Sequence, residues 1–120
     1  MDKLNIYVVD IDGTICIDTG GDYEHAEPYT DRIAMLNDLH DKGHTINYFT
    51  ARGMGRSNGN VHEAYKCAYD YTKKQLDDWG CKYNDLFIGK PFADYYIDNK
   101  GISDVQFFRH IELELWANIH

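Results

Sequence analysis

The chain has 120 residues, so we predict a single domain, residues 1–120, built around one core. It has 20 acidic and 12 basic residues and a net charge of -8, so neither nucleic acid nor a membrane surface is an expected partner. No apolar run reaches the roughly 20 residues of a membrane span. Three cysteines without CxxC spacing are typical of reduced thiols, which predicts a cytoplasmic protein.

The first predicted element is a strand over residues 4–9. This run is apolar and rich in β-branched residues, a pattern typical of a parallel sheet that is covered on both faces. Ile6 and Val8 are therefore expected to be core residues.

Two carboxylates, Asp10 and Asp12, follow this strand just ahead of Gly13. Ligands of open α/β sheets bind beyond the carboxyl ends of the strands, so both acids lie where chemistry is usually done. Two carboxylates this close repel each other unless a cation lies between them, and Mg²⁺ suits one or two carboxylates plus a phosphate. The alternative is an ordinary solvated turn, because Asp and Gly are common turn residues.

The next segments alternate between strand and helix patterns. Residues 15–27 contain a Gly-Gly turn signal and predict a small hairpin or flap beside the carboxylates. A helix is predicted from about residue 28 to a stop signal at residues 42–43, followed by a strand over 45–49. That strand runs into a polar cluster, Thr50-Ala51-Arg52-Gly53, and then a loop rich in Gly, Ser and Asn.

The second half of the chain predicts two helices and two short strands. Apolar residues on one stripe predict a long helix from residue 61 to Gly80. Short strands are expected at 85–88 and 95–97, and a final helix at 107–119, with Phe108, Ile111, Leu115 and Ile119 on one side. That helix face can cover the sheet or pair with another copy of the chain.

Polar residues thus follow three predicted strands. They are Asp10 and Asp12, then Thr50 and Arg52, then Asp98, with Lys90 just ahead of the last strand. A phosphoryl-transfer site needs a nucleophile, a proton donor, a metal and fixed donors around the transferred group. Each of these requirements has a candidate here.

The motifs DIDGT at 10–14, FTAR around Thr50, GKP around Lys90 and YYIDN around Asp98 occur in this order along the chain. Their order and spacing resemble the four motifs of the haloacid dehalogenase (HAD) superfamily of phosphatases, over essentially the whole chain. The chain is most similar to small capless members with TARG and KPxADxxID stretches, often found with capsule or sugar-nucleotide biosynthesis. The resemblance implies an α/β fold: a three-layer, Rossmann-like domain with a parallel sheet of order near 3-2-1-4 and no cap domain.

The resemblance also implies catalytic and metal-binding roles. Asp10 would attack phosphorus and form an aspartyl-phosphate, while Asp12 would protonate the leaving oxygen and then activate water. Mg²⁺ would be held by the Asp10 carboxylate, the Asp12 backbone carbonyl and Asp98. Thr50 would bond phosphoryl oxygens, and Lys90 would neutralise the phosphate and keep Asp10 charged.

Further residues are candidates for binding the substrate. The Ala51 amide would bond phosphoryl oxygens, and Arg52 would contact the substrate or its phosphate, with an exposed loop arginine as the alternative. Arg56 is a weaker candidate for the same contact. Asn99 stands where many relatives have a second acid, and it would orient a water or ligand.

The connection between the last two predicted strands is unusually short. Parallel neighbours normally need a crossover of about a dozen residues or more. Crossing three strand spacings takes about 14 Å sideways plus a strand length, against roughly 3.4 Å per extended residue, so the 88–95 link would be taut. Asp94 begins the last predicted strand, where a structural role is expected.

These observations predict a Mg²⁺-dependent phosphomonoester hydrolase that acts on a small phosphorylated metabolite, in particular a sugar phosphate. A polynucleotide 3'-phosphatase is the second enzyme candidate, against which the acidic balance argues. A metal- or phosphate-binding regulatory module without turnover is the non-enzymatic alternative. We expect the 107–119 helix to help self-association.

Overall fold

The computed structural model describes residues 3–119, with the side chains of residues 116–119, Ile119 among them, outside the description. Three parallel strands form the sheet in the order β1-β2-β3. The strands are β1 (Ile6–Asp10), β2 (Thr45–Thr50) and β3 (Asp85–Ile88). All three were predicted, with bounds within two residues of those observed. The α/β class and the 3-2-1 part of the expected strand order are therefore confirmed.

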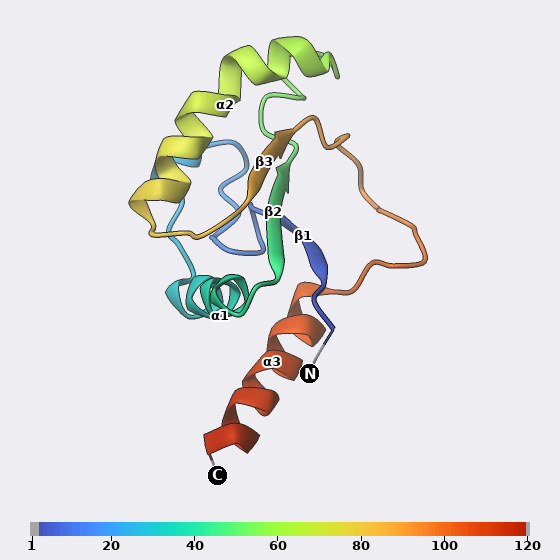
Figure 1. Ribbon diagram of the computed structural model, residues 1–120. Helices are drawn as coiled ribbons and strands as arrows, with labels where there is room; N and C mark the ends of the chain where they lie inside the picture. Colours follow the sequence, from blue (N-terminus) through green and yellow to red (C-terminus); the bar gives the residue numbers. More distant parts are fainter. Residues whose placement is uncertain (1–2, 120) are drawn as a thin grey trace.

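Three α-helices and one short 3-10 helix complete the fold. They are η1 (Tyr23–His25), α1 (Thr30–Asp41), α2 (Val61–Asp78) and α3 (Asp104–Ile119). In Figure 1, α1 and α2 lie on one side of the sheet and α3 extends below it. Asn60 begins α2 by accepting a hydrogen bond from the Glu63 amide at 3.1 Å, which satisfies one of the free amides of the first turn.

The core lies between the sheet and the helices. Alternate strand residues point to this side, and Ile46, Tyr48 and Thr50 of β2 are all buried. Phe107 at the start of α3 packs its ring 5.5 Å from that of Tyr7 on β1, on the same side of the sheet. The helices therefore share one face of the sheet.

The opposite face of the sheet is uncovered. Ile6 is 72 % exposed and Val8 is 62 % exposed, so the prediction that they are core residues is wrong. The layer of helices that was expected on this face is therefore missing from the described residues. The link that follows β3 contains no helix that could cover this face, because it remains irregular from residue 89 to residue 103.

The prediction of a strand over residues 95–97 is also wrong. Residues 89–103, which we call the outer loop, contain no strand and arc away from the sheet before α3 begins (Figure 1). Tyr95 is 83 % exposed and Ile97 is 94 % exposed. The physical reason is the taut link: too few residues follow Ile88 to cross the sheet and form a parallel strand beside β1.

Candidate active site

Asp10 and Lys90 meet at the carboxyl ends of the strands. Asp10 is the last residue of β1 and Lys90 follows β3 by two residues, and the Lys90 Nζ lies 3.5 Å from an Asp10 carboxylate oxygen. The Lys90 amide also donates to the Thr50 carbonyl at 3.2 Å, which ties the end of β3 to the end of β2. The Lys90 ammonium lies 4.1 Å from the centre of the Tyr96 ring, an attractive cation–π contact.

The environment of Asp10 works against its ionisation. Burial raises the pKa of Asp10, and the Lys90 charge opposes that rise. The Ile11 amide also lowers the pKa by bonding to the carboxylate, whereas the nearby charge of Asp12 raises it. Lys90 is therefore the side chain that does most to favour the ionised, nucleophilic form of Asp10.

Asp12 forms a two-pronged ion pair with Arg52. The Arg52 Nε and Nη2 atoms donate to the two carboxylate oxygens of Asp12 at 2.9 Å each. Nη1 of Arg52 donates to Gln75 at 2.7 Å, and the guanidinium stacks 4.5 Å from the Tyr23 ring centre. Burial by itself lowers the pKa of Arg52, but the bonds and charge of Asp12 reverse this and leave the pKa raised.

This arrangement gives Arg52 a different role from either predicted one. Its side chain is 0 % exposed, so the alternative of an exposed loop arginine is wrong. The contact with substrate is not open to a guanidinium whose donors point to Asp12, Thr72 and Gln75. Arg52 instead positions Asp12 at the end of the sheet.

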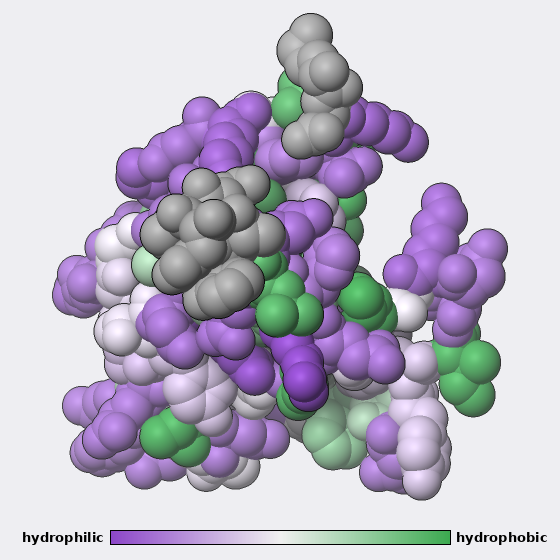
Figure 2. Space-filling model, turned by 90° about the horizontal axis from the view of Figure 1, so that it is seen from below, coloured by the Kyte–Doolittle hydropathy of each residue, from purple (hydrophilic) through white to green (hydrophobic). Residues whose placement is uncertain are grey.

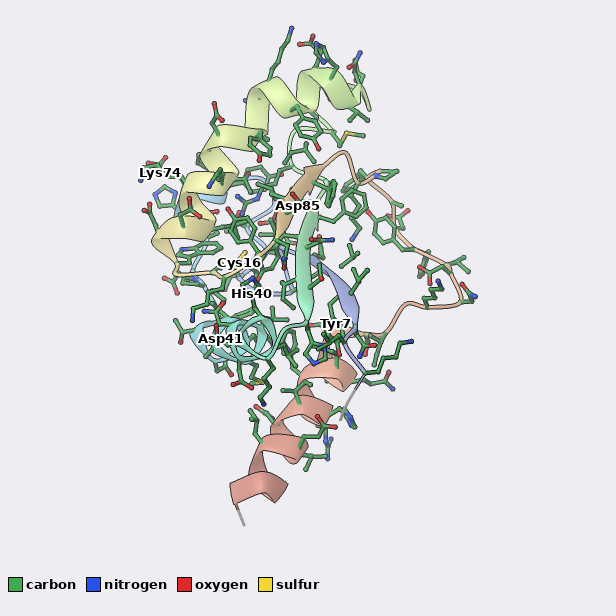
Figure 3. The ribbon with its side chains drawn as sticks, in the orientation of Figure 1. Tyr7, Cys16, His40, Asp41, Lys74 and Asp85 are labelled. Carbon is green, nitrogen blue, oxygen red and sulfur yellow. The ribbon has the colours of Figure 1, made fainter. Side chains whose placement is uncertain are left out.

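The segment after β1 folds back as the predicted flap. Gly13 has a left-handed φ of 82°, and its amide donates to the Cys16 carbonyl at 2.9 Å. An antiparallel bridge joins Cys16 to Pro28, and η1 places Tyr23 over Arg52. The Cys16 side chain lies on the helix-covered side of the sheet (Figure 3), where burial and the charge of Asp12 raise its pKa to about 12.

Sequence reasoning did not identify three of the residues that contact Asp12 or its partner Arg52. They are Tyr23, Gln75 and Cys16. Gln75 also donates to the Tyr23 carbonyl at 2.8 Å, so α2 and the flap hold each other. No motif in the sequence marks these residues.

The other residues predicted on the second strand lie close to this cluster. Thr50 is buried, and its hydroxyl oxygen accepts the Arg52 amide at 3.1 Å. Ala51 is half-buried in the same turn, and its carbonyl accepts the Met54 amide. Arg56 is exposed on the loop. Burial raises the pKa of Tyr23, and the nearby positive charge of Arg56 partly opposes that rise.

Asp98 and Asn99 are not brought to this cluster. Both are exposed in the outer loop, as is Asp94. The Asp98 carboxylate accepts the amides of Lys100 and Gly101 at 2.5 and 2.6 Å, and these bonds lower its pKa. The structure therefore unites Asp10, Asp12, Thr50 and Lys90, and leaves Asp98 apart.

Of the predicted magnesium ligands, Asp10 and Asp12 lie together at the ends of the strands, and Asp98 lies in the outer loop. At the ends of the strands, Asp10 would bind the metal through its carboxylate. Asp12 was predicted to bind it through its backbone carbonyl. Within residues 3–119, no group of three His, Cys, Asp or Glu side chains could hold a metal ion. Mg²⁺ sites usually combine one or two carboxylates with phosphate and water, and Asp10 supplies one carboxylate here.

Two cavities lie away from these residues. The larger, about 390 Å³, opens between α1 and α3, where Arg32 pairs with Asp104 at 2.7 Å. The smaller, about 200 Å³, adjoins it beside Tyr29. Neither is lined by a residue predicted to act in catalysis, and the Asp10 side chain is 34 % exposed.

Comparison with known proteins identifies a structural relative. No family model and no curated protein matches this sequence. The chain is similar to the crystal structure of a structural genomics target from Vibrio cholerae, with a TM-score of 0.80 and 27 % identity. The match covers 92 % of this chain and 95 % of that one. Across the described residues, no helix combines the length and apolar character that crossing a membrane requires.

Proposed function

We propose that this chain is a HAD-type phosphomonoester hydrolase that acts through an aspartyl-phosphate. The observation that carries the proposal is the contact between Asp10 and Lys90 at 3.5 Å, beside Thr50 on the neighbouring strand end. A carboxylate that is partly buried, opposed by one ammonium and open on its outer side is suited to attack an anionic phosphate.

In the first step, an Asp10 oxygen attacks phosphorus and the bond between phosphorus and the leaving oxygen breaks. Lys90 faces the developing negative charge on the phosphoryl oxygens. The Thr50 hydroxyl, whose oxygen accepts the Arg52 amide, would donate its own proton to the same oxygens. A proton from Asp12 neutralises the leaving alkoxide. The product alcohol departs and the phosphoryl group stays on Asp10.

In the second step, Asp12 takes a proton from water while that water attacks phosphorus and releases Asp10. The ion pair with Arg52 orients Asp12 for both transfers, because both carboxylate oxygens are held at 2.9 Å by one rigid group. One of these bonds must lengthen when Asp12 carries the proton. Arg52 is thus a positioning residue.

Mg²⁺, when bound, would neutralise the charge of the phosphate near Asp10. The Asp10 carboxylate and the Asp12 backbone carbonyl would hold it, and the steps above state what the side chains of this protein do.

A small phosphorylated metabolite, in particular a sugar phosphate, is the proposed substrate class. The net charge of -8 disfavours a nucleic-acid strand, whose backbone is bound by basic surfaces. A panel of phosphorylated metabolites and DNA 3'-phosphate ends distinguishes the two. Release of phosphate from the DNA ends alone would contradict the sugar-phosphate proposal.

The activity itself is tested with an aryl phosphate in the presence of Mg²⁺. Asp10→Asn should abolish phosphate release, because an amide cannot form the aspartyl-phosphate. Asp85→Asn is the matched control, since Asp85 is an exposed acid at the start of β3. It should retain wild-type activity.

Equal rates for wild type and Asp10→Asn would overturn the enzymatic proposal. If neither protein releases phosphate from any substrate but wild type binds phosphate, the non-catalytic regulatory module is favoured instead.

A further inference from the structure

Arg32 joins three segments of the chain through a single nitrogen. It lies in the first turn of α1, and its Nη1 atom donates to the Thr14 carbonyl at 2.9 Å and to the Asp104 carboxylate at 2.7 Å. Thr14 is the last residue of the DIDGT motif after β1, and Asp104 is the first residue of α3. One guanidinium therefore ties the segment that contains Asp12 to two helices.

Two aromatic rings fix the orientation of this guanidinium. Its central carbon lies 4.7 Å from the centre of the Phe108 ring and 5.4 Å from that of the Tyr29 ring. Phe108 is buried, and cation–π contacts of this kind are attractive. A guanidinium is planar, so a ring against its face and an acid at one nitrogen determine where its other hydrogens point. Because Asp104 takes one hydrogen of Nη1, the second points at the Thr14 carbonyl.

The ion pair of Arg32 with Asp104 is more enclosed than the pairs on the outer surface. The Arg32 side chain is 21 % exposed, whereas Lys74 and Asp78, which pair on α2, are 77 % and 61 % exposed. Figure 2 shows the molecule from below, where most of the coloured surface is hydrophilic. Ion pairs exposed on such a surface contribute little to stability. The enclosed pair of Arg32 is better suited to fixing a geometry.

The segment that Arg32 holds is a tight turn with little packed against one side. The Thr14 and Ile15 amides both donate to the Ile11 carbonyl, at 3.0 and 2.9 Å. Gly13 lines the cavity of about 200 Å³, and a Cβ there would meet a single atom within 4 Å. Packing does not set the position of the turn on this side, so that position depends on hydrogen bonds such as the one from Arg32.

Asp12 lies within this turn and is held in two places. Arg52 holds its carboxylate by two bonds of 2.9 Å. Arg32 holds the backbone two residues further on, at the Thr14 carbonyl. The two arginines therefore act on different parts of the same site: Arg52 orients the carboxylate, and Arg32 fixes the backbone from which it projects.

We propose that Arg32 is a positioning residue for Asp12, and that Asp104 keeps Arg32 in place. This role rests on the function proposed above, in which Asp12 protonates the leaving oxygen. A shift of the turn would move Asp12 away from that oxygen, and general acid catalysis requires the donor within hydrogen-bond reach. The start of α3 thereby acts on the chemical step through Asp104.

The structural part of the proposal is tested by amide hydrogen exchange, which requires no activity. Arg32→Met keeps an apolar stem against Phe108 but removes the guanidinium. The amides of residues 13–15 should exchange about tenfold faster in this variant, because the turn opens more often. Asp104→Asn should have a smaller effect in the same direction. The amides of β2 in the core should be unchanged, which separates a looser turn from global unfolding.

Lys82→Met is the matched control for the loss of an ion pair. Lys82 also joins α1 to a distant segment, because its Nζ lies 2.9 Å from the Asp41 carboxylate, at the other end of α1 from Arg32. This variant should leave the exchange of residues 13–15 at the wild-type rate. Unchanged exchange of these residues in Arg32→Met, or an equal increase in Lys82→Met, would overturn the proposal.

The effect on Asp12 is tested with two phosphate esters whose leaving groups differ. The leaving oxygen of nitrophenyl phosphate departs without a proton, whereas that of a sugar phosphate requires the proton of Asp12. Because kcat/KM reports the first step, Arg32→Met should lower it about tenfold for the sugar phosphate that wild type hydrolyses best, and less than about twofold for nitrophenyl phosphate. Arg32→Lys, which keeps the charge and can still donate to Thr14, should recover part of the loss.

The ratio of the two kcat/KM values distinguishes positioning from a loss of folded protein, which would lower both values by the same factor. An unchanged ratio in Arg32→Met would therefore overturn the positioning role. A wild-type chain that hydrolyses neither ester would contradict the proposed function, and the exchange rates of residues 13–15 would still decide whether Arg32 fixes the turn.

Discussion

A buried guanidinium holds the second carboxylate of the site. Arg52 is enclosed by Asp12, Gln75 and the Tyr23 ring, so it joins the ends of β1 and β2 to α2 and the flap. Burying two charges costs several kcal/mol, which their mutual bonds offset only while both partners are present. The stability of this corner therefore depends on the pair as a unit.

Replacing Arg52 by Met should lower the free energy of unfolding by about 3 kcal/mol, because Asp12 is then left partly buried without its partner. Urea denaturation followed by circular dichroism measures this loss. Arg56→Met, on the same loop but exposed, is the control and should change the free energy by less than about 0.5 kcal/mol. Equal stability of the two variants would show that the pair contributes nothing.

The polar cluster was predictable only in part. Asp10, Thr50 and Lys90 were expected together because parallel strands end at the same edge of a sheet, and the structure joins them there. The partner of Asp12 was not predicted, because an arginine in a Gly-rich loop has the same local sequence whether it faces solvent or the interior. Its burial is decided by Tyr23 and Gln75, which come from distant segments.

The helices and strands show the same division between local and long-range information. Strands at 45–49 and 85–88 and the helix from residue 61 were identified from periodicity and capping residues, which act within one segment. Residues 95–97 have an equally strand-like composition but form no strand. Whether they pair depends on the reach of the preceding link, which no local pattern encodes.

The contact between α2 and the turn after β2 depends on a glycine. Gly53 has a left-handed φ of 83°, and a Cβ there would lie 3.0 Å from the Ala64 carbonyl oxygen. Gly53→Ala should therefore lower the free energy of unfolding by about 2 kcal/mol or more, from backbone strain and from the displacement of α2. Thermal and urea unfolding measure the change.

Gly59→Ala is the control for this prediction. Gly59 has a similar φ of 80°, but a Cβ there meets nothing within 4 Å. It should cost only about 1 kcal/mol of backbone strain. If both variants lose the same amount, the close approach of α2 does not contribute.

The molecule as a whole combines one well-packed side with one open side. All its helices lie on the same face of the sheet, and exposed apolar side chains occur on the uncovered face and in the outer loop. An isolated chain is therefore stabilised by half of the core that a three-layer fold would provide. The remaining apolar area is available for association.

The stability of the whole chain should fall in alkaline solution. Burial raises the pKa of the Cys81 thiol to about 11, whereas an unfolded cysteine loses its proton near pH 9. Between these values the folded chain holds more protons than the unfolded chain, so the free energy of unfolding decreases as pH rises. Stability from this group is fully present below pH 9 and is lost through about pH 11.

Urea unfolding at several pH values between 8 and 11 measures this slope. Cys81→Ala should reduce it, with the buried Cys16 thiol giving part of the remainder, and Cys67→Ala, at an exposed position, is the control. A slope that is the same in all three proteins would assign the alkaline loss to other groups.

The outer loop also bears on how long the protein survives in a cell. Phe92, Tyr95 and Tyr96 are exposed on an extended backbone, which is the kind of substrate that a chymotrypsin-like protease cleaves. The chain would be cut there first, between β3 and α3, so its lifetime in a cell would depend on how accessible this loop is to proteases.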